Sequence, residues 1–278
     1  MTGIPEQDKK PRKLSFHKMI PNMITLTAMA VGMTAIRYAI DGKWEEAVIA
    51  VVVAAFLDAF DGAAARLLKA QSKLGAELDS LSDLICFGVA PGLVTFLWST
   101  HGAGRFGWFL SLLFVMAVAL RLARFNVAKA EEKPDDPLSK YFTGIPSPAG
   151  AGLALLPMIV SFQIDDPKTG SYIFSIVTQP YVVGLWLTLL SALMVSHIPT
   201  FSSKLIRVPY KMSVLALALF GILIAGLINA PWPTLTLLGT GYLATLPWSI
   251  RHYDKKKASL ARGVRDPDDL DHEDWDMP

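Results

Sequence analysis

Cysteine, histidine and charge are scarce in this sequence. The single cysteine, Cys86, excludes a disulfide framework and a metal site built from cysteines, and we interpret it as a packing residue. The five histidines are dispersed and show no metal-ligand spacing. Charged residues make up 18% of the chain, whereas soluble domains have about a quarter. With 52% hydrophobic residues and a mean hydropathy of +0.40, the 278-residue chain has the composition of a membrane protein.

The apolar residues form long runs rather than a scattered pattern. Each run is close to the roughly 20 residues that a helix needs to cross a bilayer. We therefore predict an all-α fold, a polytopic bundle of about eight transmembrane helices. The predicted spans are residues 20–40, 44–66, 76–99, 106–126, 147–163, 179–197, 211–230 and 233–250. The polar segments 1–14 and 251–278 are predicted to be disordered.

The distribution of lysine and arginine predicts the orientation of these helices. If the N-terminus is cytoplasmic, 22 of the 26 basic residues fall on the cytoplasmic side, in agreement with the positive-inside rule. We therefore predict a multi-pass protein of the bacterial inner membrane with both ends in the cytoplasm. Its inner basic residues suit anionic lipid headgroups. No basic domain separates from the spans, so nucleic-acid binding is not expected.

Four aspartates lie within 26 residues that otherwise have the character of membrane-buried helix: Asp58, Asp61, Asp79 and Asp83. Each carboxylate near the centre of a spanning helix costs roughly 2.5–3.5 kcal/mol, and the four together approach ~10 kcal/mol, less if they lie toward one membrane face. Such a cost requires a cationic partner. In the predicted orientation, the aspartates lie at the cytoplasmic face.

Helical spacing predicts that these aspartates converge. Asp58 and Asp61 share one helix face, and Gly75, Asp79 and Asp83 form an i, i+4, i+8 stripe on the next helix. Two acidic faces of this kind can meet across one cavity. Carboxylate oxygens suit Mg²⁺ or Mn²⁺ rather than zinc, whose ligands are usually cysteine or histidine. A pair of such ions can clamp phosphates during an in-line displacement.

The segment from Asp58 to Asp83 resembles the signature of the CDP-alcohol phosphotransferase family, Asp-x2-Asp-Gly-x2-Ala-Arg-x8-Gly-x3-Asp-x3-Asp, at every fixed position. The residues Pro21-Asn22-x2-Thr25 resemble the N-terminal element of that family. Two further segments resemble its phosphatidylserine synthase branch: Arg121-Leu122-Ala123-Arg124-Phe125-Asn126 and Phe142-Thr143-Gly144-Ile145-Pro146-Ser147-Pro148-Ala149. The resemblance covers roughly residues 15–200, which would form a six-helix core, and leaves residues 201–250 as additional transmembrane helices.

The resemblance implies an enzyme that transfers the phosphatidyl group of CDP-diacylglycerol to L-serine and releases CMP. Asp58, Asp61 and Asp79 would hold two divalent ions, while Asp83 would ligate one ion and also take the proton from the incoming hydroxyl. A homodimer is general in the family. The expected contacts to CDP come from Asn22, Thr25, Gly62, Ala65, Arg66 and Gly75.

These CDP contacts each have a second interpretation. Small residues such as Gly62, Ala65 and Gly75 let a nucleotide approach the backbone, but they also serve close helix packing in membranes. Arg66 could bind the diphosphate or extend its charge to the membrane interface. The polar side chains near residue 22 could contact the donor or cap the first helix.

The acceptor is predicted from a different part of the chain. Arg121 and Arg124 lie one turn apart at the cytoplasmic end of the fourth span, where either could bind a small carboxylate or anchor the helix. Because the shared signature serves the donor and the metals, three other acceptors stay open, namely glycerol 3-phosphate, an inositol phosphate and choline.

Two other functions are compatible with aspartates inside a membrane. An isoprenoid prenyltransferase uses two aspartate-rich motifs far apart in sequence, whereas here all four aspartates fall in one segment. A cation transporter commonly contains internal repeats, and the sequence has no second copy of Asp-Gly-x2-Ala-Arg. Both functions are therefore disfavoured.

Overall fold

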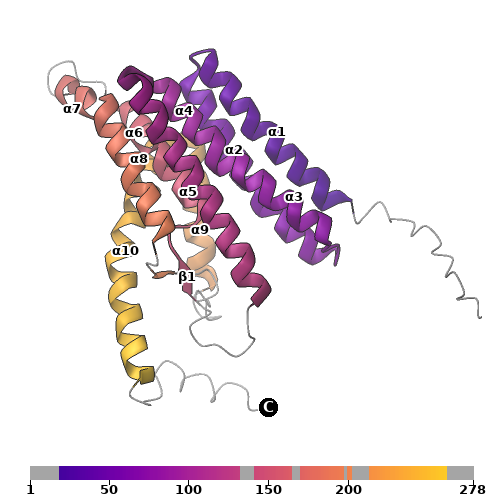
Figure 1. Ribbon diagram of the computed structural model, residues 1–278. Helices are drawn as coiled ribbons and strands as arrows, with labels where there is room; N and C mark the ends of the chain where they lie inside the picture. Colours follow the sequence, from indigo (N-terminus) through magenta and orange to yellow (C-terminus); the bar gives the residue numbers. More distant parts are fainter. Residues whose placement is uncertain (1–18, 132–140, 165–169, 197–198, 202–212, 262–278) are drawn as a thin grey trace, which may run out of the picture.

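A computed structural model gives the fold of the chain (Figure 1). The structure describes residues 19–131, 141–164, 170–196, 199–201 and 213–261. In these ranges the chain is a bundle of helices with one pair of three-residue strands, which is the exception to the predicted all-α class. The strands β1 (Tyr141–Thr143) and β2 (Pro199–Phe201) pair antiparallel, with Tyr141 opposite Phe201.

The first two helices form an antiparallel pair. Helix α1 (Ile20–Ile40) is joined to α2 (Trp44–Leu67) by a short turn, in which Gly42 has a φ of +72° that favours glycine. The contacting faces are made of small residues, which let two helices approach closely in a membrane. Ala35 and Ala39 on α1 and Ala47 and Ala50 on α2 are buried in one apolar cluster, whereas Gly32 on α1 faces Cys86 of the third span.

The third span is one continuous helical segment with a change of winding in its middle. Helix α3 (Lys73–Asp83) leads into the π-helix η2 (Leu84–Val89), which leads into α4 (Ala90–Trp98). Pro91 provides no N–H for the carbonyl of Phe87, four residues earlier, so the regular α-helical ladder is interrupted here. π-Segments of this kind occur frequently at functional sites, and this one begins directly after Asp83.

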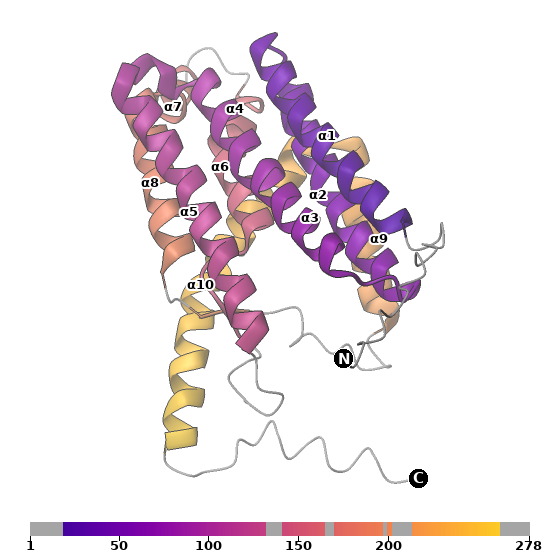
Figure 2. The ribbon, with the colours of Figure 1, turned by 45° about the vertical axis from the view of Figure 1, so that its right-hand side comes forward.

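The remaining elements complete the bundle around this segment. Their bounds are η3 (Thr100–Ala103), α5 (Gly104–Glu131), α6 (Ser147–Ser161), α7 (Gly170–Val177), α8 (Pro180–Val195), α9 (Ser213–Asn229) and α10 (Pro231–Ala261). Helices α5 and α8 pack side by side, and α10 packs against α6 (Figure 2). One apolar cluster lies where α1, α2, α4 and α6 meet, and a second lies where α5, α6 and α8 meet. The acidic segment thus lies within a framework of packed helices.

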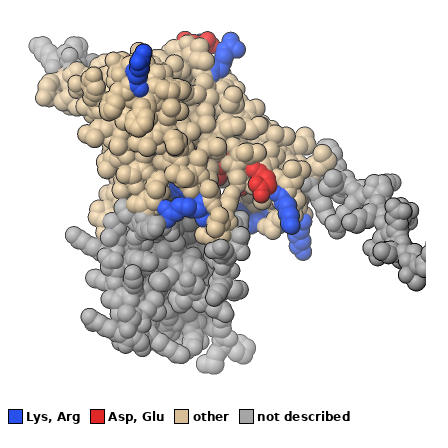
Figure 3. Space-filling view, viewed as in Figure 1, with Lys and Arg blue, Asp and Glu red and all other residues tan. Residues whose placement is uncertain are grey.

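Four helical segments are long and apolar enough to cross a membrane: residues 20–40, 44–67, 73–98 and 100–128. Three shorter apolar helices follow, over residues 147–161, 180–195 and 214–229. Many large apolar side chains are exposed, among them Phe109, Leu185 and Leu217, and Figure 3 shows a broad uncharged band between charged side chains at two levels. These features are those of a membrane helix bundle, while the count of eight spans and the orientation stay predictions.

The C-terminal boundary differs from its prediction. Helix α10 continues through residue 250, where the last span was expected to end, and reaches Ala261. The chain is therefore still helical where the sequence predicts the start of a disordered tail, because lysine, alanine and leucine after residue 254 are good helix formers. Residues 1–14 and 262–278 lie outside the described part of the chain. The short helix α7 has no counterpart among the predicted elements.

Candidate active site

The structure brings the four aspartates together, as the helical spacing predicts. Carboxylate oxygens of Asp58, Asp61 and Asp79 all lie within 4.8 Å of one another. The carboxyl group of Asp83 lies within hydrogen-bonding distance of Asp58. Helix α2 therefore supplies one half of the cluster and α3 the other half.

The cluster contains buried oxygens that have no partner. One carboxylate oxygen of each of Asp58, Asp61 and Asp83 is inaccessible to solvent and accepts no hydrogen bond from the described residues. Leaving such groups unsatisfied is costly, because burial removes the water that would otherwise solvate them. Convergent, unsatisfied carboxylate oxygens without cysteine or histidine are a donor set that fits Mg²⁺ or Mn²⁺.

The N-terminal part of α1 supports the cluster from one side. The hydroxyl of Thr25 lies beside the carboxylate of Asp61 and is 3.0 Å from the carbonyl oxygen of Pro21, to which it donates. The carbonyl of Thr25 in turn accepts a hydrogen bond of 3.3 Å from the hydroxyl of Ser82 on α3. These contacts fix α1 against both acidic helices.

The glycines of the signature differ in their surroundings. A Cβ atom at residue 75 would lie 2.9 Å from Oδ1 of Asn22 and 3.1 Å from Oγ of Ser72, so Gly75 permits a close approach of α1 to α3. Ser72 also caps α3, accepting a hydrogen bond of 3.0 Å from the Gly75 N–H. A Cβ at Gly62 would meet nothing closer than a terminal nitrogen of Arg66, at 3.7 Å. Gly75 therefore permits close helix packing, space is left open at Gly62, and the contact of either glycine with CDP stays a prediction.

The two arginines of the predicted acceptor pair point to different places. Arg121 is buried, donates a hydrogen bond of 2.9 Å to the hydroxyl of Ser147 on α6, and is close enough to Asp83 to interact with its charge. Arg124 is exposed and donates a hydrogen bond of 2.6 Å to the carbonyl of Val195 at the end of α8. The structure thus brings Arg121 within electrostatic reach of Asp83, while Arg124 is bonded to the end of α8.

Other side chains at the site are not among the sequence-predicted ones. Asn126 on α5 donates a hydrogen bond of 2.9 Å to the hydroxyl of Ser80 on α3 and so joins the two helices beside the cluster. Asn126 and Ser147 belong to the two segments with family resemblance, which was the signal that could have identified them. Tyr242 on α10 also lies close to Arg121, and no pattern in the sequence around it indicates a functional role.

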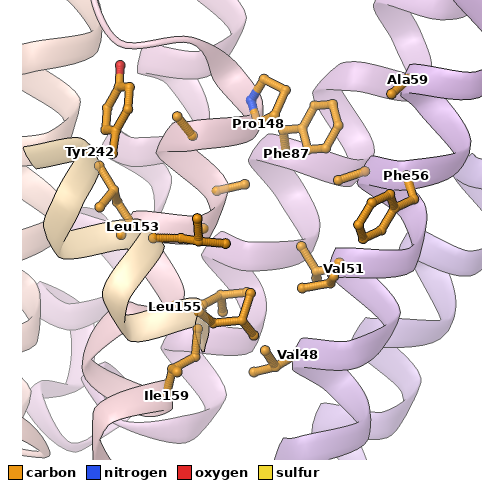
Figure 4. A pocket seen from close by; sticks show the side chains of 18 residues that line it. Val48, Val51, Phe56, Ala59, Phe87, Pro148, Leu153, Leu155, Ile159 and Tyr242 are labelled. Atoms are coloured by element: carbon orange, nitrogen blue, oxygen red, sulfur yellow. The ribbon is translucent and has the colours of Figure 1, made fainter. Parts of the chain in front are cut away.

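An apolar cavity of about 420 Å³ adjoins this region, between α2, η2, α6 and α10. Figure 4 shows Val48 and Ile159 at one end and Ala59 and Pro148 at the other, with Tyr242 along one side. Ala59 directly follows Asp58 in the chain, and Pro148 directly follows Ser147. The second end of the cavity therefore lies near the polar site.

Comparison with known protein families agrees with this geometry. The sequence model described as CDP-alcohol phosphatidyltransferase matches residues 18–183, a range that contains all four aspartates. The chain belongs to this family. A second model, described as CDP-alcohol phosphatidyltransferase 2, matches residues 211–247 in the last two helices. The family depends on divalent metal, and with its apolar helices the chain is an integral membrane protein.

Several curated relatives share one name. The chain is 32% identical over 234 residues to the CDP-diacylglycerol–serine O-phosphatidyltransferase of Mycobacterium tuberculosis, covering 84% of this chain and 79% of the relative. It is 36% identical over 199 residues to the protein of that name from Helicobacter pylori, covering 72% and 78%. A third, from Bacillus subtilis, is 36% identical over 143 residues, covering 51% and 75%.

Proposed function

We propose that this protein transfers the phosphatidyl group of CDP-diacylglycerol to the hydroxyl of L-serine, giving phosphatidylserine and CMP. The observation that carries the proposal is the convergence of four carboxylates with three unsatisfied buried oxygens, next to the buried guanidinium of Arg121. An acidic cluster fits metal-bound diphosphate, and an adjacent cation fits an acceptor with a carboxylate. The names of the relatives support serine in particular.

The metal would be held by the acidic cluster. We infer that Asp58, Asp61, Asp79 and Asp83 hold two divalent ions, Mg²⁺ or Mn²⁺. When bound, such ions supply charge neutralisation to the diphosphate of the donor. The unsatisfied oxygens of three of these residues support the assignment.

The donor nucleotide would lie over the open face of α2. Gly62 and Ala65 leave room for it, and Arg66, exposed at the end of the same helix, is in position to bind a phosphate. Asn22 and Thr25 would add polar contacts from α1, although their contacts to Gly75 and Asp61 show that they also hold the helices together.

The transfer itself needs a base for the serine hydroxyl. Asp83 would accept the hydroxyl proton as the serine oxygen bonds to the β-phosphorus of the donor and the bond from that phosphorus to the CMP oxygen breaks. Its position supports this role, because it lies beside Asp58 and within the electrostatic reach of Arg121. Neighbouring carboxylates raise the proton affinity of one member of a cluster, which makes its deprotonated form a stronger base.

The acceptor carboxylate would bind to Arg121. This guanidinium is buried and its Nε has no hydrogen-bond partner in the described chain, whereas Arg124 is engaged with α8. A charge-assisted bond of this kind contributes about 1.5–3 kcal/mol. Of the two arginines that the sequence left open, the geometry therefore supports Arg121.

The hydrocarbon part of the donor would use the apolar cavity. One end of that cavity lies at Ala59, next to Asp58, so an acyl chain could enter it while the diphosphate stays at the aspartates. We further propose the arrangement that the sequence predicts: a core over residues 15–200, additional helices over 201–250, an active site on the cytoplasmic side of the bacterial inner membrane, and a homodimer.

An acceptor panel tests the proposed function. Purified protein is incubated with CDP-diacylglycerol, Mn²⁺ and one of serine, glycerol 3-phosphate, inositol phosphate or choline, and the lipid product is identified by mass spectrometry. We expect phosphatidylserine. Turnover with another acceptor instead of serine would refute the acceptor and leave the family membership intact.

A further inference from the structure

Tyr242 has a buried hydroxyl oxygen that no residue in the described part of the chain binds. It lies on α10, outside the range 18–183 matched by the main family model. Its hydroxyl oxygen is inaccessible to solvent and makes no hydrogen bond to the described residues. A buried hydroxyl without a partner destabilises the fold, so a ligand that binds it would explain its presence.

Arg121, which lies within electrostatic reach of Tyr242, also has a buried polar atom without a partner among the described residues. Tyr242 and Arg121 are close enough to interact electrostatically, and Nε of Arg121 is likewise buried with no hydrogen-bond partner in the ranges that the structure describes. Another nitrogen of the same guanidinium is held by Ser147 at 2.9 Å, which fixes its orientation. An N–H and an O–H donor, each without a hydrogen-bond partner among the described residues, therefore belong to two side chains within electrostatic reach of one another, and the charge of Arg121 also reaches Asp83.

The ring of Tyr242 separates apolar from polar surroundings. It lines the apolar cavity together with Leu153 and Gly239. In Figure 4 its hydroxyl points away from Leu153 and Ile159, toward the end of the cavity where Pro148 lies. The ring thus closes one side of the cavity, while the hydroxyl faces the polar site.

We propose that the hydroxyl of Tyr242 and Nε–H of Arg121 together bind the carboxylate of the acceptor serine. Two donors, one of them charged, suit the two oxygens of a carboxylate. Placing the carboxylate there would hold the serine hydroxyl on the side of Asp83, which Arg121 also approaches. This inference rests on the proposed function. It assigns to α10 a residue that determines which alcohol is accepted.

The test is Tyr242→Phe, which removes the hydroxyl and keeps the ring. We expect the KM for serine to rise about 10-fold or more, as the loss of one hydrogen bond to a charged group requires. The KM for CDP-diacylglycerol should stay unchanged. The matched control is Tyr181→Phe, because Tyr181 is an exposed tyrosine on α8, and it should alter neither constant.

Thermal unfolding separates binding from a structural role. Because the hydroxyl has no hydrogen-bond partner among the described residues, Tyr242→Phe without substrate should unfold at the same temperature as wild type or at a higher one. L-Serinamide, in which a neutral amide replaces the carboxylate, gives a second readout. Wild type should strongly prefer serine over serinamide, and Tyr242→Phe should reduce that preference by raising the KM for serine alone.

The outcomes distinguish this inference from the proposed function. If wild type makes phosphatidylserine and Tyr242→Phe keeps the wild-type KM for serine, the role of Tyr242 is refuted and the proposed function stands. A rise in the KM for the donor, or a lower unfolding temperature with an unchanged serine-to-serinamide preference, would also refute it. If wild type does not use serine, both are refuted together.

Discussion

The carboxyl groups of Asp58 on α2 and Asp83 on α3 face one another within hydrogen-bonding distance, at the point where α3 changes into a π-helix. Two carboxylates this close repel one another unless a proton or a cation lies between them. The packing of small residues between α1 and α2, and the contact of α1 with α3, hold them there nevertheless. The fold thus maintains an arrangement that is favourable only when a proton or a cation binds at this pair.

Metal binding should therefore stabilise the protein as well as activate it. We expect Mg²⁺ or Mn²⁺ to raise the unfolding temperature of purified protein, and excess EDTA to abolish transferase activity. Asp61→Asn should remove most of the stabilisation by metal. Asp41→Asn is the control, because Asp41 does not belong to the cluster. Its carboxylate instead forms an ion pair with Nε of Arg37, at a distance of 3.4 Å. Full activity in excess EDTA would contradict the metal site.

The four Asp→Asn variants should differ in how far added metal restores their activity. Asp58→Asn, Asp61→Asn and Asp79→Asn weaken metal binding, so increasing Mn²⁺ should restore part of their activity. Asp83→Asn should lose kcat by about 100-fold or more, which Mn²⁺ does not restore, since the base itself is missing. The measurement is kcat as a function of Mn²⁺ concentration for each variant. Near wild-type kcat in Asp83→Asn would assign the base to another group.

Arg121 and Arg124 should have unequal effects on serine binding. Arg121→Ala is expected to raise the KM for serine by roughly 10- to 100-fold, because a charge-assisted bond is lost, while the KM for the donor changes little. Arg121→Lys should restore serine binding only in part, since an ammonium lacks the planar fork of the guanidinium. Arg124→Ala, one turn away, should leave the KM for serine near wild type. The measurement is steady-state kinetics with serine as the varied substrate. Equal values of the KM for serine in Arg121→Ala and Arg124→Ala would contradict the assignment of the serine carboxylate to Arg121.

Local periodicity explains which parts of this site could be predicted from the sequence. The convergence of Asp58 with Asp79 depends on helical spacing within two neighbouring spans, which the sequence contains directly. The choice between Arg121 and Arg124 depends on how α5 packs against α6 and α8, and no local pattern encodes that. The electrostatic interaction of Arg121 with Tyr242 joins parts of the chain that are far apart in sequence. The two three-residue strands and the eight-residue helix α7 are too short to give a clear periodic pattern. The extension of α10 was missed because its polar residues were interpreted as a tail, although lysine, alanine and leucine favour a helix.

The apolar cavity gives a prediction about the lipid chains of the donor. A Cβ at Gly152 on α6 would meet no atom within 4 Å, although Gly152 lines the cavity, so Gly152→Leu should fill space without disturbing the fold. We expect the KM for a long-chain CDP-diacylglycerol to rise by about 10-fold, equivalent to roughly 1.4 kcal/mol. A donor with short acyl chains should be affected less.

Gly221 provides the control for that experiment. It is exposed on α9, does not line the cavity, and has equally open surroundings. Gly221→Leu should therefore leave both donors unaffected. Equal effects of the two leucine variants, or equal effects on long-chain and short-chain donors, would show that the cavity does not hold an acyl chain.

Substitution by alanine should affect stability at Gly75 and donor binding at Gly62, the two glycines of the signature. In Gly75→Ala the new methyl group would lie 2.9 Å from Oδ1 of Asn22, so we expect a loss of stability of about 1–3 kcal/mol from overpacking. In Gly62→Ala the nearest atom is the mobile end of Arg66, at 3.7 Å, so the fold should tolerate the change while the methyl group occupies nucleotide space. Gly62→Ala should thus keep the unfolding temperature and raise the KM for CDP-diacylglycerol. Adding Asn22→Ala should recover stability in the Gly75→Ala background only. A double-mutant cycle measured by thermal unfolding tests this. An interaction energy near zero between the two substitutions would show that Asn22 is not the obstructing group.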